Sequence, residues 1–404
     1  MVQRNKNMAK LTSGYLFPEI RRRKKEFLEK HPNAKILSLG IGNTTEPITR
    51  YITKALANAA KELGTKEGYS GYGDEQGMTE LRKKIAEKFY NNTISSEEVF
   101  ISDGAKCDIG RIQLMFGSNA TIAVQDPAYP VYVDGSVIIG ATGTYNKQKD
   151  LFDNIVYLEC APENNFFPDL SIAPRTDLIY FSSPNNPTGA VSTKEQLKKL
   201  VDFARKNRSI IIFDAAYSEF IKDKKLPRSI FEIEGAKECC IEVSSFSKFI
   251  GFTGVRLGWS IVPKQLKYDD GSDVNQDWNR IMTTIFNGAS NIAQKGGLSA
   301  LDDKGLKEMK KTIKFYKENA AIIKKGLESM NIKTYGGINS PYIWAEFPER
   351  KSWDVFNEIL ERCHVVTTPG SGFGPAGESF IRFSCFGHRE DVEEAIKRLK
   401  EKLK

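Results

Sequence analysis

The amino-acid sequence predicts an α/β protein with a mostly parallel sheet that helices cover on both faces. From about residue 95, short apolar strands alternate with stretches long enough for a crossover helix, which is the pattern that joins parallel strands. The composition, 40% hydrophobic and 27% charged, is that of an ordinary globular protein. The expected elements are strands at 99–101, 121–124, 178–181, 210–213 and 240–243, and helices from Cys107, from Tyr129 and over 193–206.

The chain has 404 residues, more than one hydrophobic core usually includes, so we expect a large and a small domain. After about residue 300 the pattern changes to a long amphipathic stretch (304–330), short strands at 342–344 and 380–383, and a last helix at 390–403. This pattern is typical of an α+β domain. We predict an N-terminal arm with part of the small domain at 1–46, a large domain at 47–299 and the small C-terminal domain at 300–404.

The charge distribution of the chain argues against a nucleic-acid partner, and its hydrophobic pattern argues against a membrane span. The net charge is +8, from 59 basic and 51 acidic residues, and it is spread out apart from a run at 21–25, which we interpret as the solvated face of a helix. Nucleic-acid binding needs a broader basic surface with interleaved aromatic residues. No segment reaches the roughly 18 apolar residues of a membrane span, and no secretion signal follows Met1. We expect a soluble protein that acts on small, anionic substrates.

The cysteines and histidines do not indicate a metal site. His31, His364 and His388 are far apart in the sequence, and the cysteines have neither zinc-site spacing nor the density of a disulfide scaffold. The cysteines are therefore expected to be reduced thiols of a cytosolic protein: Cys107, Cys160, Cys239, Cys240, Cys363 and Cys385.

Lys248 is the strongest candidate for a catalytic residue. It stands in a serine-rich segment, 244–249, directly after an expected strand and before the glycine-spaced Arg256. A lysine amine forms imines with aldehydes, most readily when its surroundings lower its pKa. Ser245, Ser247 and Arg256 are close enough in sequence to bind the phosphate of a cofactor attached to Lys248, because hydroxyls and a guanidinium suit a phosphate.

Asp214 is a second candidate, at the end of the apolar strand 210–213. A carboxylate there is costly unless a cation faces it. A protonated pyridine nitrogen would supply that cation and would make the ring an electron sink. A third segment, 181–189, is a turn rich in proline and asparagine at the end of another strand.

Together these segments resemble the class I and II aminotransferases, which are fold-type-I enzymes dependent on pyridoxal 5′-phosphate (PLP). The resemblance covers nearly the whole chain and implies a large α/β/α domain, which binds PLP, with a smaller α+β domain. It implies that Lys248 binds PLP as a Schiff base and that Asp214 pairs with the ring nitrogen. It implies the remaining roles as follows: Asn186 and Tyr217 hydrogen-bond the phenolic oxygen, Ser245, Ser247 and Arg256 hold the phosphate, and Arg382 binds the substrate α-carboxylate.

The same resemblance adds further contacts to the cofactor. The segment 102–107 matches the family's phosphate loop, where the backbone N–H groups of Ala105 and Lys106 at a helix N-terminus suit an anion. Tyr129 matches the aromatic residue that stacks on the ring. Tyr72 matches a tyrosine that reaches the phosphate in the partner subunit, which implies an obligate homodimer with shared active sites.

In finer detail, segments 13–20, 39–47, 68–73, 102–108 and 367–374 resemble the LL-diaminopimelate aminotransferases. That family transfers an amino group between glutamate and tetrahydrodipicolinate, to give LL-2,6-diaminopimelate for lysine and peptidoglycan synthesis. Plant members carry a plastid transit peptide, and its absence here favours a bacterial cytoplasmic enzyme. The implied substrate contacts are Tyr15, Gly42, Glu75, Lys106, Tyr129, Asn186, Asn287 and Arg382, with Tyr15, Glu75 and Asn287 expected from the partner subunit.

Several alternatives remain open at this point. Asn291 lies four residues after Asn287 and could face the substrate instead, if both are on one helix. The same cofactor residues would serve an aminotransferase of broader or aromatic specificity, or a PLP-dependent lyase or synthase. A PLP-binding module without activity is less consistent with an intact Lys248, Asp214 and Arg382.

Overall fold

The computed structural model describes residues 1–11, 16–40, 42–146, 148 and 151–403. Within them, seven strands form one large sheet in the order β2-β10-β9-β8-β7-β3-β6. All neighbouring pairs are parallel except those of β10, which runs antiparallel to both β2 and β9. The strands are β2 (Val99–Ser102), β3 (Ile122–Asp126), β6 (Ile155–Glu159), β7 (Leu178–Ser182), β8 (Ile210–Asp214), β9 (Cys240–Ser245) and β10 (Gly258–Ile261).

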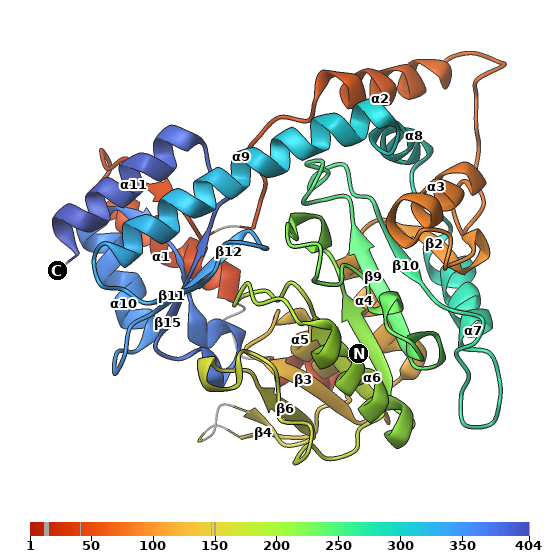
Figure 1. Ribbon diagram of the computed structural model, residues 1–404, viewed down its shortest axis with the longest axis horizontal. Helices are drawn as coiled ribbons and strands as arrows, with labels where there is room; N and C mark the ends of the chain where they lie inside the picture. Colours follow the sequence, from red (N-terminus) through yellow and green to blue (C-terminus); the bar gives the residue numbers. More distant parts are fainter. Residues whose placement is uncertain (12–15, 41, 147, 149–150, 404) are drawn as a thin grey trace.

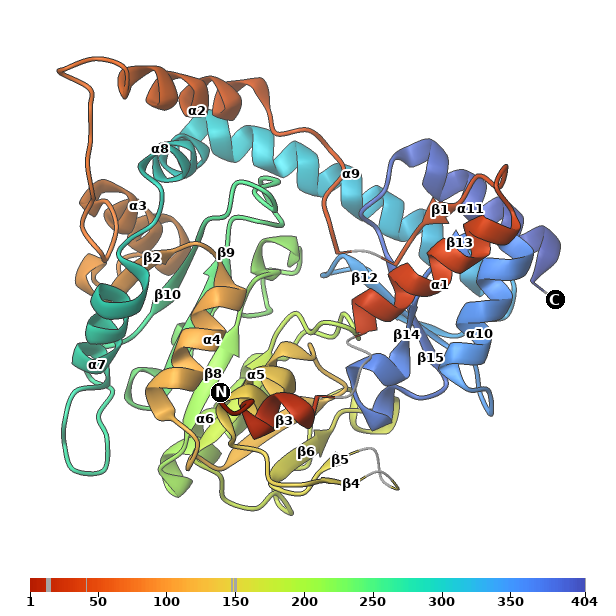
Figure 2. The ribbon, with the colours of Figure 1, turned by 180° about the vertical axis from the view of Figure 1, so that it is seen from behind.

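Helices pack against this sheet and bury its strands. Strands β2, β3, β7 and β9 are buried along their whole length, which explains their continuous apolar sequence. Helices α4 and α5 lie on one side of the sheet, with the N-terminus beside them (Figure 2). The helices of this part are α2 (Arg50–Glu62), α3 (Thr79–Tyr90), α4 (Ala105–Phe116), α5 (Val131–Ile139), α6 (Lys194–Asn207), α7 (Val274–Ile281) and α8 (Asn291–Ala300).

A second sheet is built by the C-terminal part of the chain. It is antiparallel, with the order β11-β12-β15-β14, and the N-terminal strand β1 pairs in parallel with β13 beside it. Helix α9 runs from α8 and α2 to α11 and so spans both parts of the molecule (Figure 1). The elements are α1 (Leu16–Lys30), β1 (Leu37–Ser38), α9 (Asp303–Glu328), β11 (Thr334–Gly336), β12 (Tyr342–Glu346), α10 (Ser352–Glu358), β13 (Val365–Val366), β14 (Thr368–Pro369), β15 (Phe380–Ser384) and α11 (Arg389–Lys402).

Short elements complete the described chain. Strands β4 (Tyr145–Asn146) and β5 (Leu151–Phe152) form a separate hairpin. Two π-helical turns, Met282–Phe286 and Ile359–Cys363, extend α7 and α10. The 3₁₀ turns are Lys6–Ala9, Ser96–Glu98, Pro162–Asn164, Ser218–Phe220, Ile230–Glu232, Ala236–Glu238, Gly370–Phe373 and Pro375–Gly377.

The predicted fold class is confirmed, with shifts at the ends of elements. Helix α4 begins at Ala105 instead of Cys107, because Gly104 adopts φ 128° and serves as the N-cap. Helix α5 begins at Val131 instead of Tyr129, after the turn that contains Pro127 and Pro130. The basic run at 21–25 lies on α1, as expected. The domain boundaries stay a prediction, although the pairing of β1 with β13 places this part of the arm beside the C-terminal sheet.

Candidate active site

One cavity of about 290 Å³ lies where the carboxyl ends of β7, β8 and β9 face the C-terminal sheet. Ligands bind at this end of the strands in open α/β sheets. Among the described residues that line it, most of the predicted site residues occur together: Gly42, Ala105, Lys106, Tyr129, Asn186, Asp214, Tyr217, Ser245, Ser247, Lys248, Arg256 and Arg382. The structure therefore brings these residues to one place, from segments that are far apart in the sequence.

Lys248 follows β9 and projects into this cavity. Its Nζ donates a hydrogen bond to the backbone oxygen of Gly42. Burial of the amine, together with the positive charges of Arg382 and Arg256, lowers the pKa of Lys248 to about 8. Near neutral pH the uncharged amine, which is the form that attacks a carbonyl carbon, is therefore far more populated than in an exposed lysine.

Asp214 ends β8 and is almost fully buried, at 8% exposure. Burial raises the pKa of its carboxyl group, while the hydrogen bonds from the backbone N–H of Ala216 and from Tyr132, and the charge of Lys248, act in the opposite direction. The two hydrogen bonds are both 2.9 Å long and end on different carboxylate oxygens. The cavity thus contains an acid that a cationic ligand group would stabilise in its ionised form.

The part of the cavity lined by Ser245, Ser247 and Arg256 is suited to an anion. Ser245 Oγ donates to Ser247 Oγ over 2.9 Å, and Arg256 Nη1 lies 3.5 Å from the same Ser247 oxygen. The N-terminus of α4 meets them, because a Cβ on Gly104 would lie 2.4 Å from Arg256 Nη2. Helix N-terminal N–H groups, hydroxyls and a guanidinium together form a phosphate-binding arrangement.

Arg382 on β15 is 1% exposed, and hydrogen bonds and aromatic rings fix its guanidinium. Its Nη1 donates to Asn186 Oδ1 over 2.6 Å, and its Nη2 donates to the Gly40 oxygen over 2.7 Å. The guanidinium lies 4.3 Å from the ring centroid of Tyr342 and 4.8 Å from that of Phe373. Its Nε has no hydrogen-bond partner among the described residues. A buried donor without a partner is costly, so this face of Arg382 is suited to an acceptor such as a carboxylate.

Two tyrosines of the site were not predicted from the sequence. Tyr132 lies on α5 and contacts Asp214, and Tyr342 lies on β12 with its OH 2.7 Å from the OH of Tyr217. Tyr132 follows the predicted Tyr129 by three residues, but α5 begins only at Val131, so the two tyrosines do not share a helix face and the spacing gave no signal. For Tyr342, the signal in the sequence was limited to its position in an expected strand. Other lining residues that were not predicted are Phe17, Asn43, Ile109, Ser182, Ala216 and Thr253.

Three predicted residues that the structure describes, Tyr72, Glu75 and Asn287, are not among those that line this cavity. Tyr72 is 92% exposed, Glu75 is half-buried and Asn287 is exposed. Asn291 Nδ2 donates to Ser70 Oγ over 3.0 Å and to the Gly71 oxygen over 3.1 Å, so this amide holds the segment that carries Tyr72. Tyr15 lies outside the described residues.

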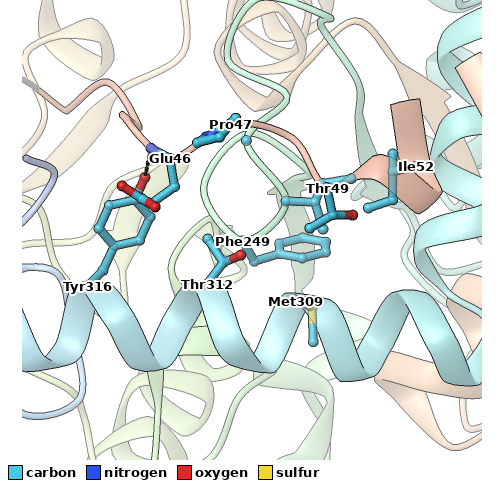
Figure 3. Close-up of a pocket in the computed structure, with 10 residues that line it drawn as sticks. Glu46, Pro47, Thr49, Ile52, Phe249, Met309, Thr312 and Tyr316 are labelled. Atoms are coloured by element: carbon cyan, nitrogen blue, oxygen red, sulfur yellow. Dashed lines mark hydrogen bonds between the residues drawn. The ribbon is translucent and has the colours of Figure 1, made fainter. Parts of the chain in front are cut away.

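A separate, smaller pocket is lined in part by the residues that follow Lys248 in the chain. It lies between α9, the segment that leads into α2, and Phe249 (Figure 3). The OH of Tyr316 on α9 accepts hydrogen bonds from the backbone N–H groups of Thr45 (2.9 Å) and Glu46 (2.7 Å). Helix α9 therefore fixes the chain shortly after Gly42, whose backbone oxygen contacts Lys248.

Comparison with known proteins defines the class of protein. The family model described as aminotransferase class I and II matches residues 34–399, so the class that the fold and site define is that of the class I and II aminotransferases, which are PLP-dependent. The LL-diaminopimelate aminotransferase of Protochlamydia amoebophila (strain UWE25) is 57% identical over 403 residues, which cover 100% of this chain and 98% of that protein. The chloroplastic LL-diaminopimelate aminotransferase of Arabidopsis thaliana is 59% identical, over 100% of this chain and 87% of that protein.

A solved structure agrees with these sequence matches. The L,L-diaminopimelate aminotransferase from Chlamydomonas reinhardtii superposes with a TM-score of 0.96 at 60% identity, over 99% of this chain and 98% of that one. The chain therefore belongs to the LL-diaminopimelate aminotransferase family. No helix in the described part of the chain is long and apolar enough to cross a membrane. The six cysteines, all among the described residues, are free thiols.

The residues of the cavity fit the cofactor of this class. The buried Asp214 needs a cationic partner, Lys248 has an amine of lowered pKa, and the serines and Arg256 form an anion site at the helix N-terminus. A pyridine nitrogen, an aldehyde and a phosphate are the three groups of PLP that these features match. A side chain on Gly104 would collide with Arg256, so the phosphate end depends on glycine at this position.

The lowered pKa of Lys248 gives a testable pH dependence. In the apo-protein, labelling of Lys248 by an amine-selective reagent is expected to follow a titration near pH 8, because only the uncharged amine reacts. Mass spectrometry of the peptide that contains Lys248 measures the labelling rate at each pH. Arg256→Gln is expected to move the midpoint upward, since it removes one repelling charge. A midpoint equal to that of the same lysine in the urea-denatured chain would contradict the effect of burial.

Proposed function

We propose that this chain transfers an amino group between glutamate and tetrahydrodipicolinate, with PLP as cofactor and with uptake of one water molecule that opens the ring, to give 2-oxoglutarate and LL-2,6-diaminopimelate. The observation that carries the proposal is the convergence of Lys248, Asp214 and Arg382 on one cavity, in which the Arg382 Nε is buried without a partner among the described residues. The identity of 57–60% to relatives named for this reaction supports the choice of substrate.

Each cavity residue has a distinct task in this proposal. PLP supplies an aldehyde and a ring that withdraws electrons. The Lys248 amine binds the cofactor and moves the proton at the substrate α-carbon as a general base and acid. Asp214 holds the ring nitrogen in its protonated form.

The other residues of the cavity orient the bound groups. Tyr217 and Asn186 would hold the phenolic oxygen, and Asn186 would do so through its NH₂ group, because its carbonyl already accepts from Arg382. Arg382 binds the α-carboxylate, and Ala105, Lys106, Ser245, Ser247 and Arg256 bind the phosphate. Tyr129, which lines the cavity, would pack against the cofactor ring and the substrate, and Gly42 would leave room for the substrate where a Cβ would lie 2.7 Å from the Tyr342 OH.

The distal end of the substrate needs residues beyond Arg382. Diaminopimelate has an ammonium and a carboxylate there, so its site requires an acid as well as a cation or an amide. We propose Glu75, Asn287 and Tyr15 of the partner subunit, with Lys106, for this role. The alternative, Asn291, is less suited because its amide is engaged with Ser70 and Gly71.

The direct test of the reaction uses the two stereoisomers of its product. Purified protein reconstituted with PLP is given LL-diaminopimelate or meso-diaminopimelate with 2-oxoglutarate, and the glutamate formed is measured. The proposal expects rapid glutamate formation with the LL isomer. Turnover of aromatic amino acids with none of diaminopimelate would instead support an aminotransferase of aromatic specificity.

We also propose a cytoplasmic homodimer with shared active sites. The 92% exposure of Tyr72 and the 70% exposure of Tyr69 support this, since two large aromatic side chains exposed on one short segment are suited to burial against a partner. The free cysteines suit a reducing compartment.

Mixed dimers test the shared sites. Lys248→Ala and Tyr72→Phe proteins are each expected to be impaired, but a heterodimer of the two has one site free of both changes. Partial activity should therefore return when subunits exchange, as followed with two affinity tags. Verified exchange without recovery would show that Tyr72 acts within its own subunit or not at all.

Glu75→Gln is expected to change substrate preference. Loss of the carboxylate leaves the distal ammonium of LL-diaminopimelate without a partner, so its kcat/KM should fall by an amount equivalent to roughly 2–4 kcal/mol. Glutamate lacks that ammonium and should be affected less, or even helped. Steady-state kinetics with both donors measure the difference. An equal loss for both substrates would assign Glu75 a structural role, and a larger loss for glutamate would overturn the charge argument.

A further inference from the structure

The carboxylate of Asp214 is held before any ligand enters the cavity. Oδ1 accepts from the backbone N–H of Ala216 and Oδ2 accepts from the OH of Tyr132, each over 2.9 Å. The first donor belongs to the turn after β8 and depends only on local backbone. The second comes from α5, which follows β3, and is separated from Asp214 by 82 positions in the sequence.

Packing fixes the place of the Tyr132 hydroxyl. The side chain is 2% exposed, and its ring stacks on that of Tyr180 with centroids 5.4 Å apart and an interplanar angle of 14°. The Tyr132 backbone oxygen accepts from Gln113 Nε2 over 3.0 Å and from Ser136 Oγ over 2.7 Å. Neither the ring nor the backbone can move without disturbing this core, so the hydroxyl is aimed at Asp214 by the fold itself.

This hydrogen bond acts against the effect of burial. Burial favours the neutral form of a carboxyl group, whereas a donated hydrogen bond stabilises the ionised form. The charge of Lys248 also favours the ionised form, but in the working enzyme that amine is engaged with the cofactor. Among the described residues, Tyr132 and the Ala216 N–H are then the donors that remain on Asp214.

We propose that Tyr132 is a positioning residue that keeps Asp214 ionised and directed at the cofactor ring nitrogen. The proposal rests on the proposed function, because it assumes that PLP occupies this cavity. If Tyr132 is lost, the proton shared between Asp214 and the ring nitrogen shifts toward the carboxylate. The ring then becomes a poorer electron sink, while binding of the amino-acid substrate is unaffected.

The experiment compares Tyr132→Phe with Tyr180→Phe. Both variants remove one buried phenol OH from the same stacked pair, but of these two hydroxyls it is that of Tyr132 that donates to Asp214. Each holoenzyme is prepared with PLP labelled with ¹⁵N in the ring. The ¹⁵N chemical shift reports the protonation of the ring nitrogen directly, and kcat and KM are measured on the same samples.

In Tyr132→Phe, the ¹⁵N shift is expected to move toward the unprotonated value and kcat to fall roughly 10- to 100-fold, the range for one hydrogen bond to a charged group. KM should stay near that of the parent protein. Tyr180→Phe should keep the parent ¹⁵N shift. An unchanged ¹⁵N shift in Tyr132→Phe, or an equal change in both variants, would overturn the proposal. Failure of the parent protein to bind PLP would instead refute the proposed function.

Discussion

Lys248→Ala is expected to abolish transamination and the visible absorbance of the lysine-bound cofactor. Lys248 lines the cavity together with Asp214 and Arg382, and its pKa, lowered to about 8, suits both bond formation and proton transfer. Absorbance spectra after reconstitution with PLP and a single-turnover assay with glutamate measure the two losses.

Chemical rescue separates loss of the amine from loss of the fold. The variant should retain the parent circular dichroism and still bind PLP through its phosphate. A small primary amine added to the Lys248→Ala protein should restore part of the proton transfer, since the cavity then has room for it. Parent-level turnover in the variant would mean that another amine has the role given to Lys248.

Asp214→Ala is expected to lower kcat by several orders of magnitude while some PLP remains bound. Without the carboxylate, the ring nitrogen has no anionic partner in a buried site and loses its proton, so the ring withdraws electrons poorly. The Tyr132 hydroxyl and the Ala216 N–H also lose their acceptor. Measured PLP affinity and the pre-steady-state rate with glutamate separate cofactor binding from the chemical step.

Asp214→Asn is the matched variant for this position. It keeps the shape of the side chain and an oxygen that can accept from Ala216, but it removes the charge. A loss close to that of Asp214→Ala would assign the effect to the charge, whereas a mild loss in Asn alone would assign it to packing. Near-normal turnover in both variants would show that the ring nitrogen has a different partner.

The sequence alone determined the fold class and the nucleus of the site. Asp214 ends a strand of continuous apolar sequence, Lys248 and Asn186 lie in the turns that follow two other such strands, and the ends of parallel strands converge at one edge of the sheet. Because the strand pattern and the position at its end are local features, Lys248 and Asp214 could be identified as candidates without knowledge of the tertiary structure. The resemblance to aminotransferases then implied the roles of Asn186, Arg382 and the phosphate loop.

Only the tertiary structure decided which side chains surround that nucleus. Tyr132 and Tyr342 reach Asp214 and Tyr217 across 82 and 125 positions of sequence, and an aromatic residue in a helix or strand looks the same in sequence whether it fills a core or holds a carboxylate. The same holds for Asn291. The sequence left open whether its amide faces the substrate, and the packing of α8 places it against Ser70 and Gly71 instead. Such contacts are set by the packing of elements that are distant in the chain, and no local pattern encodes them.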